Sequence, residues 1–152
     1  MTRKTTTHHA TSLRVNHVGL TVTDLDTSID FYTKVVGMNF LQRGFKTGGE
    51  WFDTLTNNDG AIIDAARVGF EGFSLQLVQY HAGASDRCQT GHNRAGNMHL
   101  CVDVEDVDAK HAEVTAIGAH RPTPIVPVAG GPTRSFYIED PDGIPVEFLQ
   151  KP

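Results

Sequence analysis

The sequence predicts an α+β protein made of two tandem βαβββ modules, whose curved mixed β-sheets together form a cup. The first observation behind this prediction is a duplicated segment. Residues 16–26 read NHVGLTVTDLD, and residues 97–108 read NMHLCVDVEDVD. Each copy places a histidine, His17 or His99, at the head of an alternating apolar run. The second observation is that each copy continues through a helical pattern to a glycine, which indicates that a whole structural unit has been repeated.

The first module is expected to span residues 13–80. Residues 13–22 alternate like a strand, so that every second side chain shares a face: His17, Gly19 and Thr21. Asp24 is a good N-cap for the following helix, whose buried stripe and closing glycine are Ile29, Tyr32, Val35, Val36 and Gly37. Three strands follow at 38–45, 61–68 and 73–80, with a long loop at 46–60 and a turn at 69–72.

The second module, residues 97–152, repeats this plan after a polar, glycine-containing linker at residues 81–96. A strand at 98–104 precedes a helix that is capped by Asp106. Residues 119–128 hold three prolines, which favours an interrupted strand at a sheet edge. Two further strands, 135–139 and 144–149, flank the turn sequence Asp-Pro-Asp-Gly at 140–143. Residues 1–12 are expected to be a mobile tail in which His8 and His9 are solvated.

Composition excludes several classes of protein. The net charge of −5 gives no reason to expect nucleic-acid binding, which needs clustered Lys and Arg. No apolar run approaches the roughly 20 residues that cross a bilayer, and no secretory signal is visible. Cys88 and Cys101 indicate no disulfide framework, so we expect two reduced thiols in a cytoplasmic protein.

Four polar residues occupy matched positions on the faces that look into the predicted cup. His17 and His99 open the first strand of each module, and Gln76 and Glu147 lie midway along the last strand of each. A single histidine at the start of a strand is usually an ordinary hydrogen-bonded residue, so the matched placement of all four carries the argument. Two imidazoles, an amide oxygen and a carboxylate suit one divalent metal ion, with water filling the remaining positions.

The sequence resembles the vicinal oxygen chelate superfamily, which includes glyoxalase I, methylmalonyl-CoA epimerase, extradiol dioxygenases, fosfomycin resistance proteins and bleomycin-binding proteins. The resemblance covers nearly the whole chain and rests on short motifs: NHVGL at 16–20, DFY at 30–32 with Gly37, LQL at 75–77, His99, and YIEDPDG at 137–143 with VEF at 146–148. It implies paired βαβββ modules and a homodimer. It also implies one divalent ion, Co, Mn, Ni, Zn or Fe, at His17, Gln76, His99 and Glu147.

The resemblance leaves the reaction open. A ligand set of this kind is similar to methylmalonyl-CoA epimerase and implies proton abstraction next to a metal-bound carbonyl of a small-molecule substrate, as an epimerase, isomerase or glyoxalase-type lyase. In the epimerase branch a third-strand glutamate is the base, and Asp64 falls at about that point; the alternative is that Asp64 faces solvent. In the glyoxalase branch Glu147 itself can be the base.

Two other functions are weighed against this one. An Fe(II) extradiol-type dioxygenase would use only His17, His99 and Glu147, and a non-catalytic binding or resistance protein would need no metal. For an anionic substrate, the candidate partners are Lys46, Arg94 and Arg134.

Overall fold

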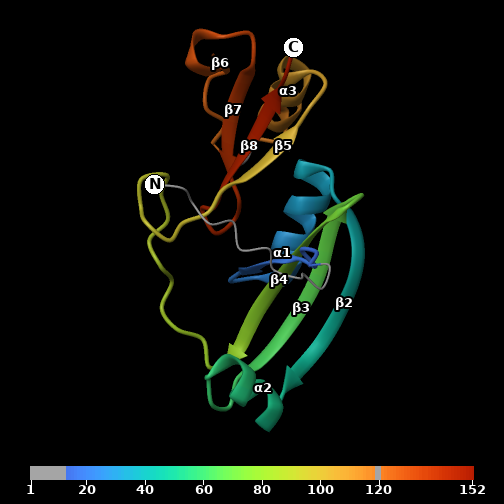
Figure 1. Cartoon of the computed structure of the whole chain (residues 1–152), viewed down its shortest axis with the longest axis vertical. Coiled ribbons are helices and arrows are strands. Elements are labelled where there is room, and N and C mark those ends of the chain that lie inside the picture. Colours follow the sequence, from blue (N-terminus) through green and yellow to red (C-terminus); the bar gives the residue numbers. More distant parts are fainter. Residues whose placement is uncertain (1–12, 119–120) are drawn as a thin grey trace, which may run out of the picture.

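Two four-stranded mixed sheets form the framework of the protein (Figure 1). The computed structural model describes residues 13–118 and 121–152, so the tail expected at residues 1–12 lies outside the described residues. The first sheet has the order β1-β4-β3-β2 and comprises β1 (Val18–Thr21), β2 (Asn39–Gly48), β3 (Ile62–Phe70) and β4 (Phe73–Ala82). The second has the order β5-β8-β7-β6 and comprises β5 (Leu100–Asp103), β6 (Val126–Pro127), β7 (Arg134–Glu139) and β8 (Pro145–Gln150).

The two sheets share one topology. β1 runs parallel to β4, and β5 runs parallel to β8, while the remaining neighbours in each sheet are antiparallel. A parallel pair needs a crossover, and a helix after the first strand supplies it in both modules. The predicted α+β class and the paired βαβββ order are confirmed. The edge strand expected in the proline-rich stretch is β6, which is only two residues long.

The first crossover is a composite helix. α1 (Leu25–Asp30) runs directly into a π-helical turn, η1 (Phe31–Val36), which ends at Gly37 with φ of 96°. This left-handed conformation is the one for which a glycine is favoured at a helix end. The second crossover is α3 (Val107–Ala116), and a single 3₁₀ turn, η2 (Val128–Gly130), follows β6.

The duplication extends to individual hydrogen bonds. Asp24 caps α1 by accepting from the Thr27 N–H at 2.7 Å, and Asp106 caps α3 by accepting from the Ala109 N–H at 2.9 Å. A glutamine from the last strand of each module binds the first N–H of the helix, at 3.0 Å in both: Gln79 to Leu25 and Gln150 to Val107. The same local interactions therefore start both helices, as the repeated sequence predicts.

The stretch 46–60, which the sequence indicates to be a loop, contains a short helix, α2 (Glu50–Thr56). The helix is preceded by glycines and followed by asparagines, which are typical of loops. For this reason the sequence pattern does not indicate a helix here. Phe52 is only 7% exposed and packs with Ala61 and Ile63, whereas Trp51 is 60% exposed. Burial of one aromatic side chain against the sheet stabilises this helix.

The two modules are joined by one apolar core and by buried hydrogen bonds from the 140–143 turn. The core includes side chains of both modules, among them Leu77 and Phe148. The Tyr32 hydroxyl donates to Asp140 Oδ2 at 3.0 Å across the boundary. Asp142 accepts from Thr23 twice, from its N–H at 3.0 Å and its hydroxyl at 2.7 Å. Figure 1 shows the resulting shape, with the two sheets toward opposite ends of an elongated molecule. No helix in the described part of the chain is long and apolar enough to span a membrane.

Candidate functional site

The first-module site residues lie together on one face of the first sheet. His17 immediately precedes β1, and Gln76 of β4 pairs with Gly19 on one side and with Arg67 of β3 on the other. Residues paired directly across neighbouring strands share a face, so Gln76 and Arg67 lie side by side. A Cβ added to Gly19 would meet nothing within 4 Å, which leaves open space above the sheet at this point.

The ring of His17 is contacted at its Nδ1 atom. Asn16 Oδ1 lies 2.7 Å from Nδ1, and Arg67 Nη2 lies 3.2 Å from it. When Nδ1 carries the proton and donates to Asn16, the lone pair is on Nε2. Metal-binding histidines are oriented by a hydrogen bond of this kind at the other ring nitrogen. The ring is therefore prepared to offer Nε2 to a ligand.

The second-module residues occupy the matching positions of the second sheet. His99 precedes β5, and Glu147 of β8 pairs with Cys101 on one side and with Tyr137 on the other. The Tyr137 hydroxyl donates to Glu147 Oε2 at 2.9 Å, and the Ser135 hydroxyl donates to Oε1 at 2.5 Å. His99 Nε2 lies 3.8 Å from Glu147 Oε2. The sheet thus brings an imidazole and an oriented carboxylate together.

Hydrogen bonds set the charge state of this carboxylate. Partial burial acts to raise the pKa of Glu147, but donors on Ser135, Tyr137 and Cys101 outweigh it and hold the pKa below its ordinary value. Burial, followed by the bond to Glu147, raises the pKa of Tyr137 to about 12. Burial and the same carboxylate raise the pKa of Cys101 to about 11. Near neutral pH, Glu147 is thus an anion surrounded by neutral donors.

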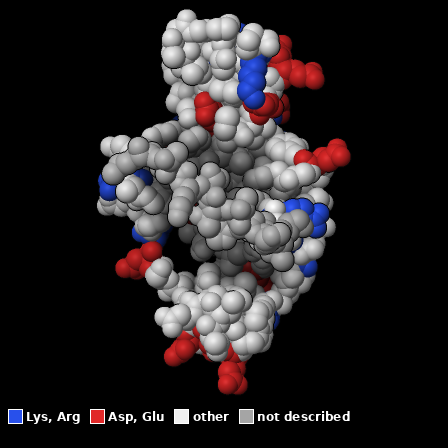
Figure 2. Space-filling view, viewed as in Figure 1, with Lys and Arg blue, Asp and Glu red and all other residues white. Residues whose placement is uncertain are grey.

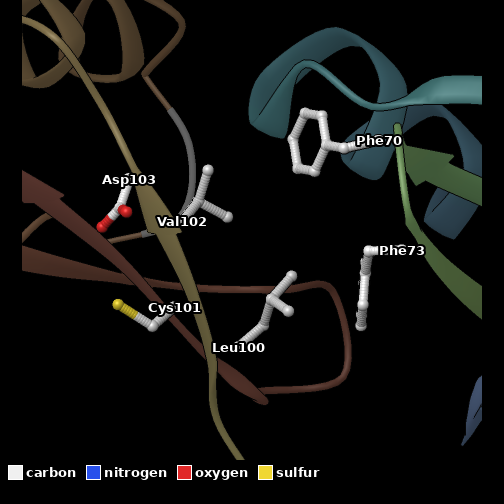
Figure 3. A pocket seen from close by; sticks show the side chains of 6 residues that line it. All are labelled: Phe70, Phe73, Leu100, Cys101, Val102 and Asp103. Atoms are coloured by element: carbon white, nitrogen blue, oxygen red, sulfur yellow. The ribbon is translucent and has the colours of Figure 1, made fainter. Parts of the chain in front are cut away.

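The two half-sites do not meet within one chain. In the described ranges, 13–118 and 121–152, no group of three His, Cys, Asp or Glu side chains lies close enough to hold a metal ion. Figure 3 shows Leu100 and Val102 of β5 pointing toward Phe70 and Phe73 across a cavity of about 300 Å³. Cys101, which shares a face with Glu147, points away from that cavity. The Glu147 face of the second sheet is therefore turned away from the first-module hairpin.

The four side chains nevertheless have the chemistry of a divalent-metal site. His17 keeps Nε2 for a ligand, and the carboxylate of Glu147 is ionised and held by two hydroxyl groups. Imidazole, amide oxygen and carboxylate together match the preferences of ions such as Zn, Ni, Co, Fe and Mn. The donor set therefore fits a metal once both half-sites face one another.

The placement of Asp64 does not support the role of base considered for it. Asp64 pairs with Gln79, which is three residues from Gln76 along β4 and so lies on the opposite face of the sheet. Its carboxylate accepts from the Lys46 N–H at 2.6 Å and lies 3.2 Å from His81 Nε2. The role of base was expected for Asp64 because a charged residue is unusual within a strand pattern. That pattern alone does not show which face of the sheet carries the side chain.

Arg67 is a cup-face residue that the sequence reasoning missed. Phe70 pairs with Phe73 around a two-residue turn, and counting back from that pair places Arg67 opposite Gln76. The sequence places a four-residue turn at 69–72, which would set Arg67 opposite Ser74; the observed two-residue turn shifts the register and sets it opposite Gln76. Of the cations that were singled out instead, Arg134 is tied to Asp108 at 2.6 Å, and Lys46 and Arg94 are exposed. Lys and Arg side chains on the face in Figure 2 lie in separate places.

Comparison with known proteins assigns the family. The sequence matches the Glyoxalase/Bleomycin resistance protein/Dioxygenase superfamily over residues 14–148. The chain belongs to this superfamily. It is 31% identical to a probable lactoylglutathione lyase of Vibrio cholerae, over 90% of each chain. It is 33% identical to a lactoylglutathione lyase of Neisseria meningitidis serogroup B, over 91% of each.

Solved structures of this superfamily share the fold. A glyoxalase family protein from Bacillus cereus superposes with a TM-score of 0.75 at 23% identity, covering 93% of this chain and 96% of that one. A fosfomycin resistance protein from Listeria monocytogenes superposes with a TM-score of 0.65 at 15% identity, covering 93% and 95%. The Listeria monocytogenes fosfomycin resistance protein has also been solved in complex with Mn(II) and a sulfate ion. The resemblance inferred from the motifs is confirmed.

Proposed function

We propose that the protein is a divalent-metal-dependent lyase of the glyoxalase type, which moves a proton from the sulfur-bearing carbon of a thiol–oxoaldehyde adduct to the adjacent carbonyl carbon. The single observation that carries the proposal is Glu147, an ionised carboxylate held by Tyr137 and Ser135 beside His99. The relatives named lactoylglutathione lyase support this branch of the superfamily.

The number of available bases favours a lyase over an epimerase. An epimerase that removes a proton from one face and returns it to the other is best served by two bases. Asp64, the candidate second base, lies on the opposite face of its sheet from Gln76. A transfer that uses one carboxylate for both halves of the reaction needs only Glu147.

In this proposal Glu147 takes the proton from the carbon that bears sulfur and hydroxyl, and returns it to the adjacent carbonyl carbon. The hydroxyl on the sulfur-bearing carbon loses its proton, and the former carbonyl oxygen gains one, so the product is the thioester of a 2-hydroxy acid with the same atoms as the substrate. Tyr137 and Ser135 fix the direction of the carboxylate and keep it charged between the two transfers. A divalent ion bound by His17, Gln76, His99 and Glu147 would make the C–H bond more acidic by polarising the carbonyl.

We further propose that two copies of the chain complete the cup as a homodimer. The faces that carry His17 and Glu147 do not converge within one chain. Within the described residues, β1 pairs with β4 alone and β5 with β8 alone, so both strands keep a free edge beside a candidate ligand. Large apolar side chains are also exposed on β2 and α2, which favours an interface: Phe40, Leu41, Phe45, Trp51 and Leu55.

The reaction is tested with glutathione and methylglyoxal, using protein loaded in turn with Ni(II), Co(II), Mn(II) and Zn(II). We expect thioester to accumulate with at least one of these ions. Glu147→Gln should lower kcat by about 100-fold or more, since it removes the base. Glu139→Gln is the matched control, because Glu139 is an exposed glutamate on the neighbouring strand.

Two results would contradict the proposal. One is the absence of thioester with every ion, and the other is an undiminished rate in the Glu147→Gln variant. Oxygen uptake with catechols by Fe(II)-loaded protein would identify the dioxygenase branch instead. Tight binding of a small molecule that persists in chelator would identify a binding protein.

A further inference from the structure

Arg67 carries a positive charge on the cup face of the first sheet without an anion to neutralise it. Among the described residues it makes no ion pair, and its Nε atom is buried without a hydrogen-bond partner. Its polar contact is the 3.2 Å approach of Nη2 to His17 Nδ1. Burying part of a guanidinium without a partner costs free energy, so the position calls for a function.

The tautomer of His17 decides whether the ring accepts from this guanidinium. When Nδ1 carries the proton and donates to Asn16 Oδ1, at 2.7 Å, it has no lone pair for Arg67 Nη2, at 3.2 Å. Both groups would then present N–H bonds to one another. The Nη donors of the guanidinium, rather than the buried Nε, are therefore the ones to meet a molecule that enters the open space above Gly19.

The duplicated fold supplies a comparison for Arg67. It stands opposite Gln76 as Tyr137 stands opposite Glu147. In the second module the donor and the carboxylate satisfy each other, at 2.9 Å. In the first module the donor is a cation and its neighbour is a neutral amide, and the described residues supply no negative charge to complete the pair.

We propose that Arg67 binds a carboxylate of the substrate, and that the site takes a thiol–oxoaldehyde adduct that carries a carboxylate close to its carbonyl. This inference rests on the proposed function, because it names the substrate class of that site. A guanidinium binds a carboxylate through two parallel hydrogen bonds, which fixes the orientation of the bound molecule as well as its charge. Gln76 lies directly beside Arg67, so such a carboxylate is held next to the carbonyl that reacts.

The experiment measures binding by calorimetry, with pyruvate and its neutral methyl ester as matched probes and metal-loaded protein as the receptor. Wild type should prefer pyruvate, and Arg67→Gln should weaken pyruvate binding by about 10- to 100-fold while leaving the ester unchanged. Arg67→Lys keeps the positive charge but loses the two parallel N–H donors of the guanidinium, so its affinity for pyruvate should lie between those of the wild type and Arg67→Gln. Arg121→Gln is the charge-matched control, because Arg121 is 87% exposed.

Several outcomes would overturn the inference. One is equal binding of pyruvate and its methyl ester by the wild-type protein. Another is a preference for pyruvate that persists in Arg67→Gln, because the bound metal ion alone would then explain that preference. Loss of metal from Arg67→Gln would make Arg67 part of the metal site instead. Failure of the proposed lyase function is distinguished from these outcomes, because it is detected in the thioester assay and in the effect of Glu147→Gln on that assay.

Discussion

Mixing two inactive variants is the most direct test of how the site is assembled. His17→Ala removes a ligand from the first half-site, and Glu147→Gln removes one from the second. If each site takes His17 from one chain and Glu147 from the other, each variant alone should bind metal poorly at both sites of its dimer. A heterodimer of the two variants should instead hold one intact site and one site that lacks both residues.

The size of the recovery follows from this arrangement. When the two variants associate at random, about half of the dimers are heterodimers and each of these has one good site of two, so the mixture should bind about one quarter of the wild-type metal. Heterodimers purified with two different affinity tags should bind about half. Metal per chain by elemental analysis is the primary assay, and thioester formation should recover in parallel.

A clear result would refute the reasoning. If the site lay within one chain, every chain in the mixture would still lack a ligand, and neither metal nor activity would return. If the His17→Ala and Glu147→Gln proteins each kept full metal binding, the ligand assignment itself would be wrong. A monomeric wild-type protein that binds one metal per chain would exclude the shared cup.

Three other perturbations follow from individual contacts. Tyr32→Phe removes the buried hydrogen bond to Asp140 between the modules and should lower the free energy of unfolding by about 1 to 2 kcal/mol in urea denaturation, with metal binding unchanged. Tyr137→Phe removes a donor from Glu147 and should weaken metal binding by about 10-fold in a competition titration with a chelator, whereas an unchanged affinity would show that the donor is dispensable. Asp64→Asn should leave kcat within about twofold, because Asp64 lies on the opposite face of its sheet from Gln76. The hydrogen bond from the Lys46 N–H lowers the pKa of the Asp64 carboxyl group on folding. The ionised carboxylate therefore stabilises the folded protein at pH values above the pKa that Asp64 has in the unfolded chain, and this stabilisation is lost as the pH falls through the lower folded pKa. Asp64→Asn should accordingly make the melting temperature less dependent on pH in the acidic range.

Most of the fold is predictable because local interactions set it. The two capping aspartates, Asp24 and Asp106, start helices where the sequence indicates them. The closing glycine, Gly37, adopts the conformation for which glycine is favoured. Alternation along β1 and β4 gives the correct faces for Leu20 and Leu77, both of which are buried. These signals work because capping, turn formation and period-two patterning involve residues that are close in the chain.

The structure adds most where distant residues decide the outcome. Helix α2 depends on burial of Phe52 against residues of β3, and nothing in its glycine-flanked segment indicates that contact. The face of Asp64 depends on strand register, since a shift of one residue in the pairing reverses the face of every side chain. Arg67 was missed for the same reason, because the turn between β3 and β4 is two residues long and not the four residues, 69–72, that the sequence indicates.

The sequence by itself is enough to predict the repeated module, the four matched polar residues and the superfamily, because each depends on short motifs or on regular spacing. The tertiary structure decided how those residues are grouped, as two separate pairs on sheets that face different ways. It also decided that Glu147 is held by hydroxyl donors and that Arg67 has no counter-ion within residues 13–118 and 121–152. The physical reason is that grouping and charge depend on which strands pair and which faces are buried. Both are set by packing between residues far apart in the chain.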